Sequence, residues 1–146
     1  MRRLSLVAFA IIAVAAFACG SEGVAEDGFE GSLIVNPDST YVLDDLTGAG
    51  YKKPKLIELE DKPNVQEAWF GFFDQKNVEV VFYASQKDAI EHGIPFAKEI
   101  VGAERDMSVG GQTRFVAYAV AGNVLLMCEF PEDTCENLIA QLGSGN

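Results

Sequence analysis

The chain has 146 residues, of which 49% are hydrophobic and 23% are charged, a size that suits one folded domain. This composition excludes an intrinsically disordered chain, and 14 Gly and 5 Pro without a triplet period exclude a collagen-like fibre. The formal net charge is −11. Because an acidic surface repels nucleic acid and anionic lipid, we expect no nucleic-acid partner.

Residues 1–18 have the pattern of a secretory signal peptide. Arg2 and Arg3 precede an uncharged run from Leu4 to Ala18, which is the arrangement that export signals use. As a helix this run spans about 22 Å, too short for the ~30 Å hydrocarbon core of a bilayer. We therefore expect export of the chain and no permanent membrane-spanning anchor.

Cys19 follows Ala16, Phe17 and Ala18, and this junction has two interpretations. It satisfies the small-x-small rule of ordinary signal peptidase, and it is similar to a bacterial lipobox. In the second case Cys19 carries a lipid anchor, and the acidic residues 19–32 form a flexible tether between the membrane and the domain. In the first case the protein is secreted with a spare thiol.

Cys128 and Cys135 remain as an even pair, which predicts a disulfide in an oxidising compartment. The alternative is two buried thiols that act as small hydrophobic side chains. The spacing and the lack of a nearby His argue against a metal site.

The first half of the domain is predicted to contain one helix and three strands. Apolar spacing indicates a helix over 39–49, with Asp38 or Ser39 as its cap. Alternating polar and apolar residues predict a strand over 55–60. Two further strands, 67–73 and 78–85, form a hairpin around 74–77.

The second half is predicted to contain two helices and a hairpin. A helix over 86–101 is interrupted at Gly93 and Pro95, and 104–112 is expected to be a loop. Strands over 113–121 and 123–130 turn at Gly122 and Asn123. A last helix begins near 131–133 and ends at Gly143.

The order is therefore α-β-β-β-α-β-β-α. Because hairpins dominate, we expect an α+β domain over 33–146, with a mainly antiparallel sheet of about five strands and helices packed on one face.

This arrangement resembles a group of small, uncharacterised, exported bacterial lipoproteins over roughly residues 40–143. The resemblance rests on the leader ending at Cys19 and on five segments: Leu46–Gly50, Phe70–Phe73, Val78–Tyr83, Asn123–Leu126 and Leu138–Gly143. It implies a cell-envelope lipoprotein with this α+β order, and it implies no catalytic residue.

Few residues have the pattern of a catalytic, cofactor or metal site. His92 is the single histidine, and it stands beside Glu91 and Gly93 in a predicted helix, where a solvent-facing role is expected. The acidic groups 38–45 and 58–61 lack the alternating ligands and central Gly of a calcium loop. Residues 109–113 lack the Lys of a P-loop, and the ion-pair cluster 104–106 is typical of a solvated loop. We expect no cofactor and no metal.

These observations favour a non-enzymatic, lipid-anchored envelope protein that contacts the membrane through Cys19 and binds another protein or an extracytoplasmic ligand. One alternative is a small hydrolase that uses two carboxylates in one concave pocket, within about 10 Å of each other. The other is a secreted structural or inhibitory protein.

Overall fold

A computed structural model describes residues 32–59, 61–102, 104–107, 111–130 and 133–144. The predicted signal peptide, Cys19 and residues 20–31 of the predicted tether lie outside the described residues. The described part of the chain forms an α+β domain, as the sequence predicts.

The sheet has seven strands, six of which lie in the order β1-β6-β7-β4-β3-β2. β1 is parallel to β6, and all the other pairs are antiparallel, which confirms the expected mainly antiparallel sheet. β5 pairs with the first part of β6. The strands are β1 (Ser32–Val35), β2 (Lys52–Ile57), β3 (Val65–Phe73), β4 (Lys76–Tyr83), β5 (Glu104–Met107), β6 (Gly111–Ala121) and β7 (Val124–Glu129).

The helices are α1 (Leu43–Gly48), α2 (Gln86–Asp88), α3 (Ile94–Ile100) and α4 (Thr134–Ser144), with a π turn, η1 (Ala89–Gly93), between α2 and α3. The predicted interruption at Gly93 and Pro95 is confirmed by this π turn. Pro95 has no N–H to donate within the helix, so the hydrogen-bond pattern changes in the turn before it. α1 begins at Leu43, later than the predicted residue 39, because Asp45 caps it in place of Asp38 or Ser39.

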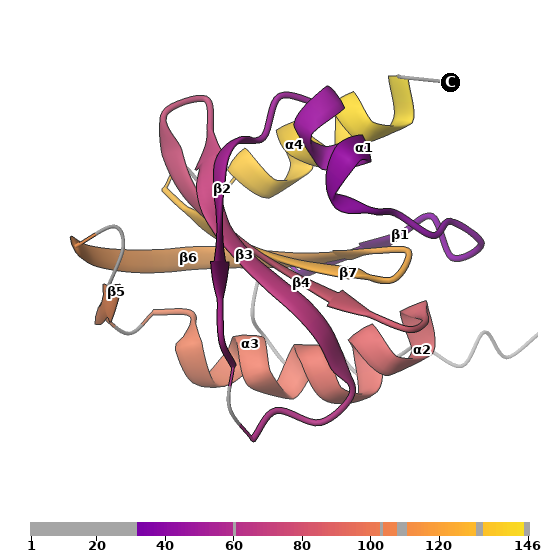
Figure 1. Cartoon of the computed structure of the whole chain (residues 1–146), viewed down its shortest axis with the longest axis horizontal. Helices are drawn as coiled ribbons and strands as arrows, with labels where there is room; N and C mark the ends of the chain where they lie inside the picture. The colour runs from indigo at the N-terminus through magenta and orange to yellow at the C-terminus, as the bar shows by residue number, and fades with distance from the viewer. Residues whose placement is uncertain (1–31, 60, 103, 108–110, 131–132, 145–146) are drawn as a thin grey trace, which may run out of the picture.

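The helices cover both faces of the sheet, whereas the sequence predicted one face. α1 and α4 lie on one side and α2 and α3 on the other (Figure 1). The reason is visible in β4, whose Val78, Val80 and Phe82 belong to the core under α1 and α4, while Val81 and Tyr83 belong to the core under α2 and α3. A strand that is buried on both faces needs helices on both sides.

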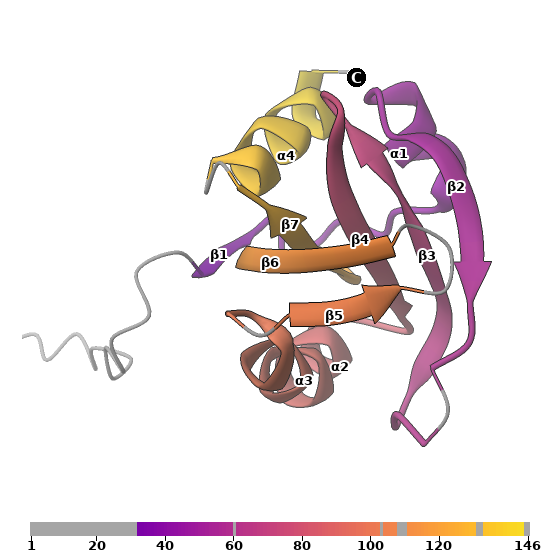
Figure 2. The ribbon, with the colours of Figure 1, turned by 90° about the vertical axis from the view of Figure 1, so that its left-hand side faces the viewer.

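Two strands were not predicted. Residues 104–107, expected to be part of a loop, form β5 against β6. The second strand that was not predicted is β1, which lies at one edge of the sheet, with β2 at the opposite edge (Figure 2). The β3–β4 turn is also tighter than expected, since Asp74 and Gln75 alone form it, both with positive φ.

The predicted disulfide between Cys128 and Cys135 is present. Cys128 lies near the end of β7 and Cys135 lies in the first turn of α4, and both side chains are buried. The bridge therefore fixes the start of α4 to the end of β7, a strand in the middle of the sheet order. None of the helices within the described ranges is long and apolar enough to cross a membrane.

Candidate functional site

Two cavities lie along helix α4 on the face of the sheet that α1 and α4 cover. The first has a volume of about 700 Å³ and lies between residues 36–41, α1 and the end of α4. The second has a volume of about 510 Å³ and lies between the start of β2, the β3–β4 turn and the start of α4. Both are lined by Ala49 and Gln141. We call the two cavities together the α4 groove.

One wall of the first cavity is the segment 36–41, which we call the strap. Asn123, only 4% exposed, holds it in place. The Asn123 Oδ1 accepts a hydrogen bond from the Tyr41 N–H at 2.7 Å, and its Nδ2 donates to the Tyr41 carbonyl at 3.2 Å and to the Tyr83 carbonyl at 3.1 Å. The strap is therefore tied to the β6–β7 turn and to the end of β4.

Gly122 brings the strap and the β6–β7 turn close together. Its φ is +52°, and a Cβ at this position would collide with the carbonyl of Ser39. Its N–H donates to the Val35 carbonyl at 3.0 Å, which fixes the end of β1 to the same turn. Glycine meets both requirements because it lacks a Cβ.

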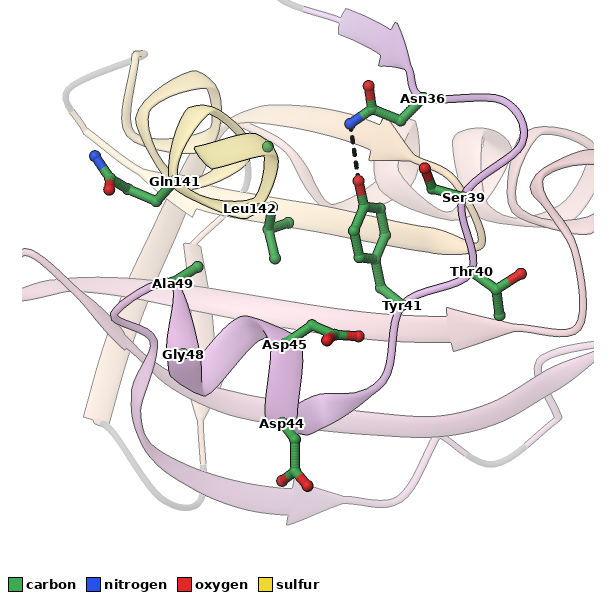
Figure 3. A pocket seen from close by; sticks show the side chains of 11 residues that line it. Asn36, Ser39, Thr40, Tyr41, Asp44, Asp45, Gly48, Ala49, Gln141 and Leu142 are labelled. Atoms are coloured by element: carbon green, nitrogen blue, oxygen red, sulfur yellow. Dashed lines mark hydrogen bonds between the residues drawn. The ribbon is translucent and has the colours of Figure 1, made fainter. Parts of the chain in front are cut away.

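The strap presents hydrogen-bonding groups to the cavity. Asn36 Nδ2 donates to Tyr41 Oη at 2.9 Å (Figure 3). Because the phenol oxygen accepts this bond, the Tyr41 O–H remains able to donate to another group, and the Asn36 Oδ1 remains able to accept. Leu142 of α4 adds an apolar side chain to the lining.

Helix α1 contributes two neighbouring carboxylates. Asp45 Oδ2 accepts a hydrogen bond from the Val42 N–H at 2.9 Å and so caps the helix. In Figure 3 the Asp45 side chain extends toward Tyr41, whereas Asp44 points away on the other side of α1. Both side chains are exposed, and Asp45 is the carboxylate nearer the cavity interior.

The second cavity contains two lysines. Lys52 is exposed and Lys76 is half-buried, and Asp74 also lines the cavity. Within the described ranges the one ion pair joins Lys62 to Glu99, so neither lysine of the cavity takes part in one there. Thr134 and Asn137, in the first turn of α4, complete this end of the groove.

The other residues considered from sequence do not join the groove. His92 is half-buried in the π turn between α2 and α3. Asp38, Glu58 and Asp61 do not line either cavity, and Cys19 lies outside the described residues. Among the side chains that are described, no three His, Cys, Asp or Glu gather to form a metal site.

Sequence reasoning missed Asn123, Gln141 and Lys76 as site residues. Asn123 was recognised as a turn residue, but its partner Tyr41 lies 82 residues away. Lys76 lies in the middle of the chain and Gln141 near its end, and neither has a motif of its own. The one available signal was the exposed polar face of the last helix, on which Asn137 and Gln141 are four residues apart.

A buried titratable group lies elsewhere, within the sheet. Glu79 of β4 is fully buried. Burial, reinforced by the charge of Glu79, raises the pKa of Tyr83 to about 12, and the same two causes raise the pKa of Tyr51. Tyr51 Oη donates to the Val78 carbonyl at 3.3 Å. Both phenols therefore stay neutral at physiological pH.

No curated protein and no solved structure matches the chain. Residues 42–113, from the N-cap of α1 into β6, match a family model. This segment supplies α1 and the two lysines of the groove, and it leaves out the strap, β7 and α4. Over these residues the chain is similar to a protein family described as Family of unknown function (DUF6810).

Proposed function

We propose that the chain is an exported protein, anchored to a membrane of the cell envelope by a lipid on Cys19, and that its domain is a non-enzymatic binding module. The observation that carries the proposal is the disulfide between Cys128 and Cys135. Disulfides of this kind persist in oxidising compartments, outside the cytosol. The bridge uses two of the three cysteines, and the third is Cys19. The lipobox-like sequence before Cys19 predicts that this residue carries the lipid.

The groove supports binding better than catalysis by two carboxylates. Hydrolysis of that kind needs two carboxyl groups that face each other across roughly 5–10 Å of substrate space. Asp44 and Asp45 are adjacent on α1, and neighbouring helix residues do not face each other. Asp45 is also engaged as a helix cap through the Val42 N–H.

The test of the anchor is the intact mass of the membrane-extracted protein before and after reduction and alkylation, beside a Cys19→Ala variant. We expect a mature chain that begins at Cys19 and carries diacylglycerol and an N-acyl chain, and we expect that mass to disappear in the variant. A double variant, Cys128→Ala with Cys135→Ala, is the matched control, because it removes the disulfide and keeps the acylation site. An unmodified, soluble product that begins at Cys19 would refute the anchor and favour a secreted protein.

A further inference from the structure

The geometry points to a ligand class for the α4 groove: we propose that it binds a short, extended peptide with both termini free. The ammonium group lies at the end of the groove near Asp45, and the carboxylate lies at the end near Lys52 and Lys76. The inference rests on the proposed function of the domain as a binding module and specifies what that module binds.

The two ends of the groove carry opposite charges. The described residues that line the first cavity include Asp44 and Asp45, of which Asp45 lies nearer the interior, and no Lys, Arg or His. Among the described residues, the second is lined by Lys52 and Lys76 and by one carboxylate, that of Asp74. In a chain with a formal net charge of −11, a local excess of positive charge is unusual. A ligand with one charge at each end complements this arrangement.

The dipole of helix α4 has the same sign as the side-chain charges at each end of the groove. Its first turn lines the lysine cavity through Thr134 and Asn137, and its end lines the aspartate cavity through Leu142 and Gly143. A helix carries partial positive charge at its N-terminus and partial negative charge at its C-terminus. Glu136, also in the first turn, does not line the cavity, so it does not face the proposed carboxylate.

The length of the groove sets the length of the ligand. Thr134 and Gly143 mark its two ends on α4, and a rise of 1.5 Å per residue places them about 14 Å apart along the helix axis. An extended chain covers about 3.3–3.6 Å per residue. The charged termini of a peptide of about four residues therefore reach both ends, whereas those of a dipeptide do not.

The middle of the groove can satisfy the peptide groups of such a ligand. The exposed side chain of Gln141 lines both cavities, and its amide can donate and accept hydrogen bonds. The Tyr41 O–H and the Asn36 Oδ1 provide a further donor and acceptor from the strap. Because Asn123 already fixes the strap, little conformational entropy is lost there when a ligand binds.

The test is isothermal titration calorimetry of the detergent-extracted full chain with tetraalanine. The comparison ligands are N-acetyl-tetraalanine, tetraalanine amide, dialanine and the polyamine spermidine. We expect tetraalanine to bind, and each blocked peptide and dialanine to bind about tenfold more weakly, since each loses one charge-assisted contact.

Two charge-removing variants test the orientation. Asp45→Asn keeps an oxygen that can cap α1, and it should weaken tetraalanine about tenfold while leaving N-acetyl-tetraalanine unaffected. Lys76→Gln should weaken tetraalanine similarly while leaving the amide unaffected. Glu91→Gln and Lys98→Gln, exposed on the opposite side of the sheet, are the matched controls and should bind as the unchanged chain does.

Three outcomes would overturn the inference. Tetraalanine could fail to bind, blocked and free peptides could bind equally, or spermidine could bind where tetraalanine does not. The acylation experiment on Cys19 is independent of all three, so a failure of the ligand assignment is distinguishable from a failure of the proposed anchor.

Discussion

Replacing Asn123 with Ala tests whether one buried amide holds the strap against the sheet. The substitution removes three hydrogen bonds, two to the backbone of Tyr41 and one to the carbonyl of Tyr83. A buried polar group left without a partner costs about 1–3 kcal/mol. Tyr41 is half-buried, so water can replace Asn123 as the partner of its backbone groups. Tyr83 is buried, so its carbonyl loses a partner that water does not replace. We expect the free energy of unfolding to fall by roughly 3 kcal/mol.

The assay is urea unfolding of the oxidised protein, followed by circular dichroism, with Asn123→Asp as the comparison. The Asp side chain can accept from the Tyr41 N–H, but as a carboxylate it cannot donate to the Tyr41 and Tyr83 carbonyls. It should therefore be at least as destabilising as Ala at pH 7 and should recover part of the loss when the carboxyl group is protonated at low pH. A loss below about 1 kcal/mol for Asn123→Ala would refute the reasoning.

Three further predictions concern other features of the domain. Gly122→Ala should lower the free energy of unfolding by more than about 2 kcal/mol, measured by urea unfolding, because a Cβ meets the Ser39 carbonyl at a positive φ; a neutral result would contradict this close approach. Removing the disulfide with Cys128→Ala and Cys135→Ala should cost about 2.5 kcal/mol in the same assay, since the closed loop is short; an unchanged midpoint would argue against this contribution. Because the folded pKa of Tyr83 is raised to about 12, above the unfolded value near 10, its contribution to stability is full below pH 10 and is lost as the pH rises toward 12. Phenolate absorbance should show a titration step near pH 12, and a Tyr83→Phe variant should lose that step, whereas Tyr51, whose pKa is also raised, should still titrate late.

The predictions from sequence were most accurate where the signal was local. The interruption at Gly93 and Pro95 and the turn at Gly122 depend on residues next to each other in the chain. The pairing of Cys128 with Cys135 followed from the number of cysteines and the export signal, and the structure confirms it.

The features that were missed depend on contacts between distant segments. β5 has the polar sequence Glu-Arg-Asp-Met and is a strand because β6 pairs with it. β1 is short and parallel to a strand more than 80 residues away, so no turn signal marks it. The helices on the second face of the sheet were not predicted because Glu79 interrupts the apolar run of β4. A charged residue at that position indicates a face exposed to solvent, whereas Glu79 is buried.

The groove itself could not be predicted for a similar reason. Asp45, Lys76 and Gln141 lie in three separate regions of the sequence, and each taken alone is an ordinary exposed or half-buried polar residue. Gln141 lines one cavity with Asp45 and the other with Lys76 because α1 and α4 cover the same face of the sheet. The charge pattern of the α4 groove is therefore a property of the topology.

The position of β1 has a mechanical consequence for the N-terminal anchor that we propose. β1 is the outermost strand, bonded to β6 over Ser32–Val35. Its last carbonyl, that of Val35, accepts from both Gln86 Nε2 and the Gly122 N–H. Tension on the preceding residues acts first on this short strand and on the two hydrogen bonds to the Val35 carbonyl. The residues that follow β1 in the chain, the strap and α1, are pulled directly only after β1 has detached.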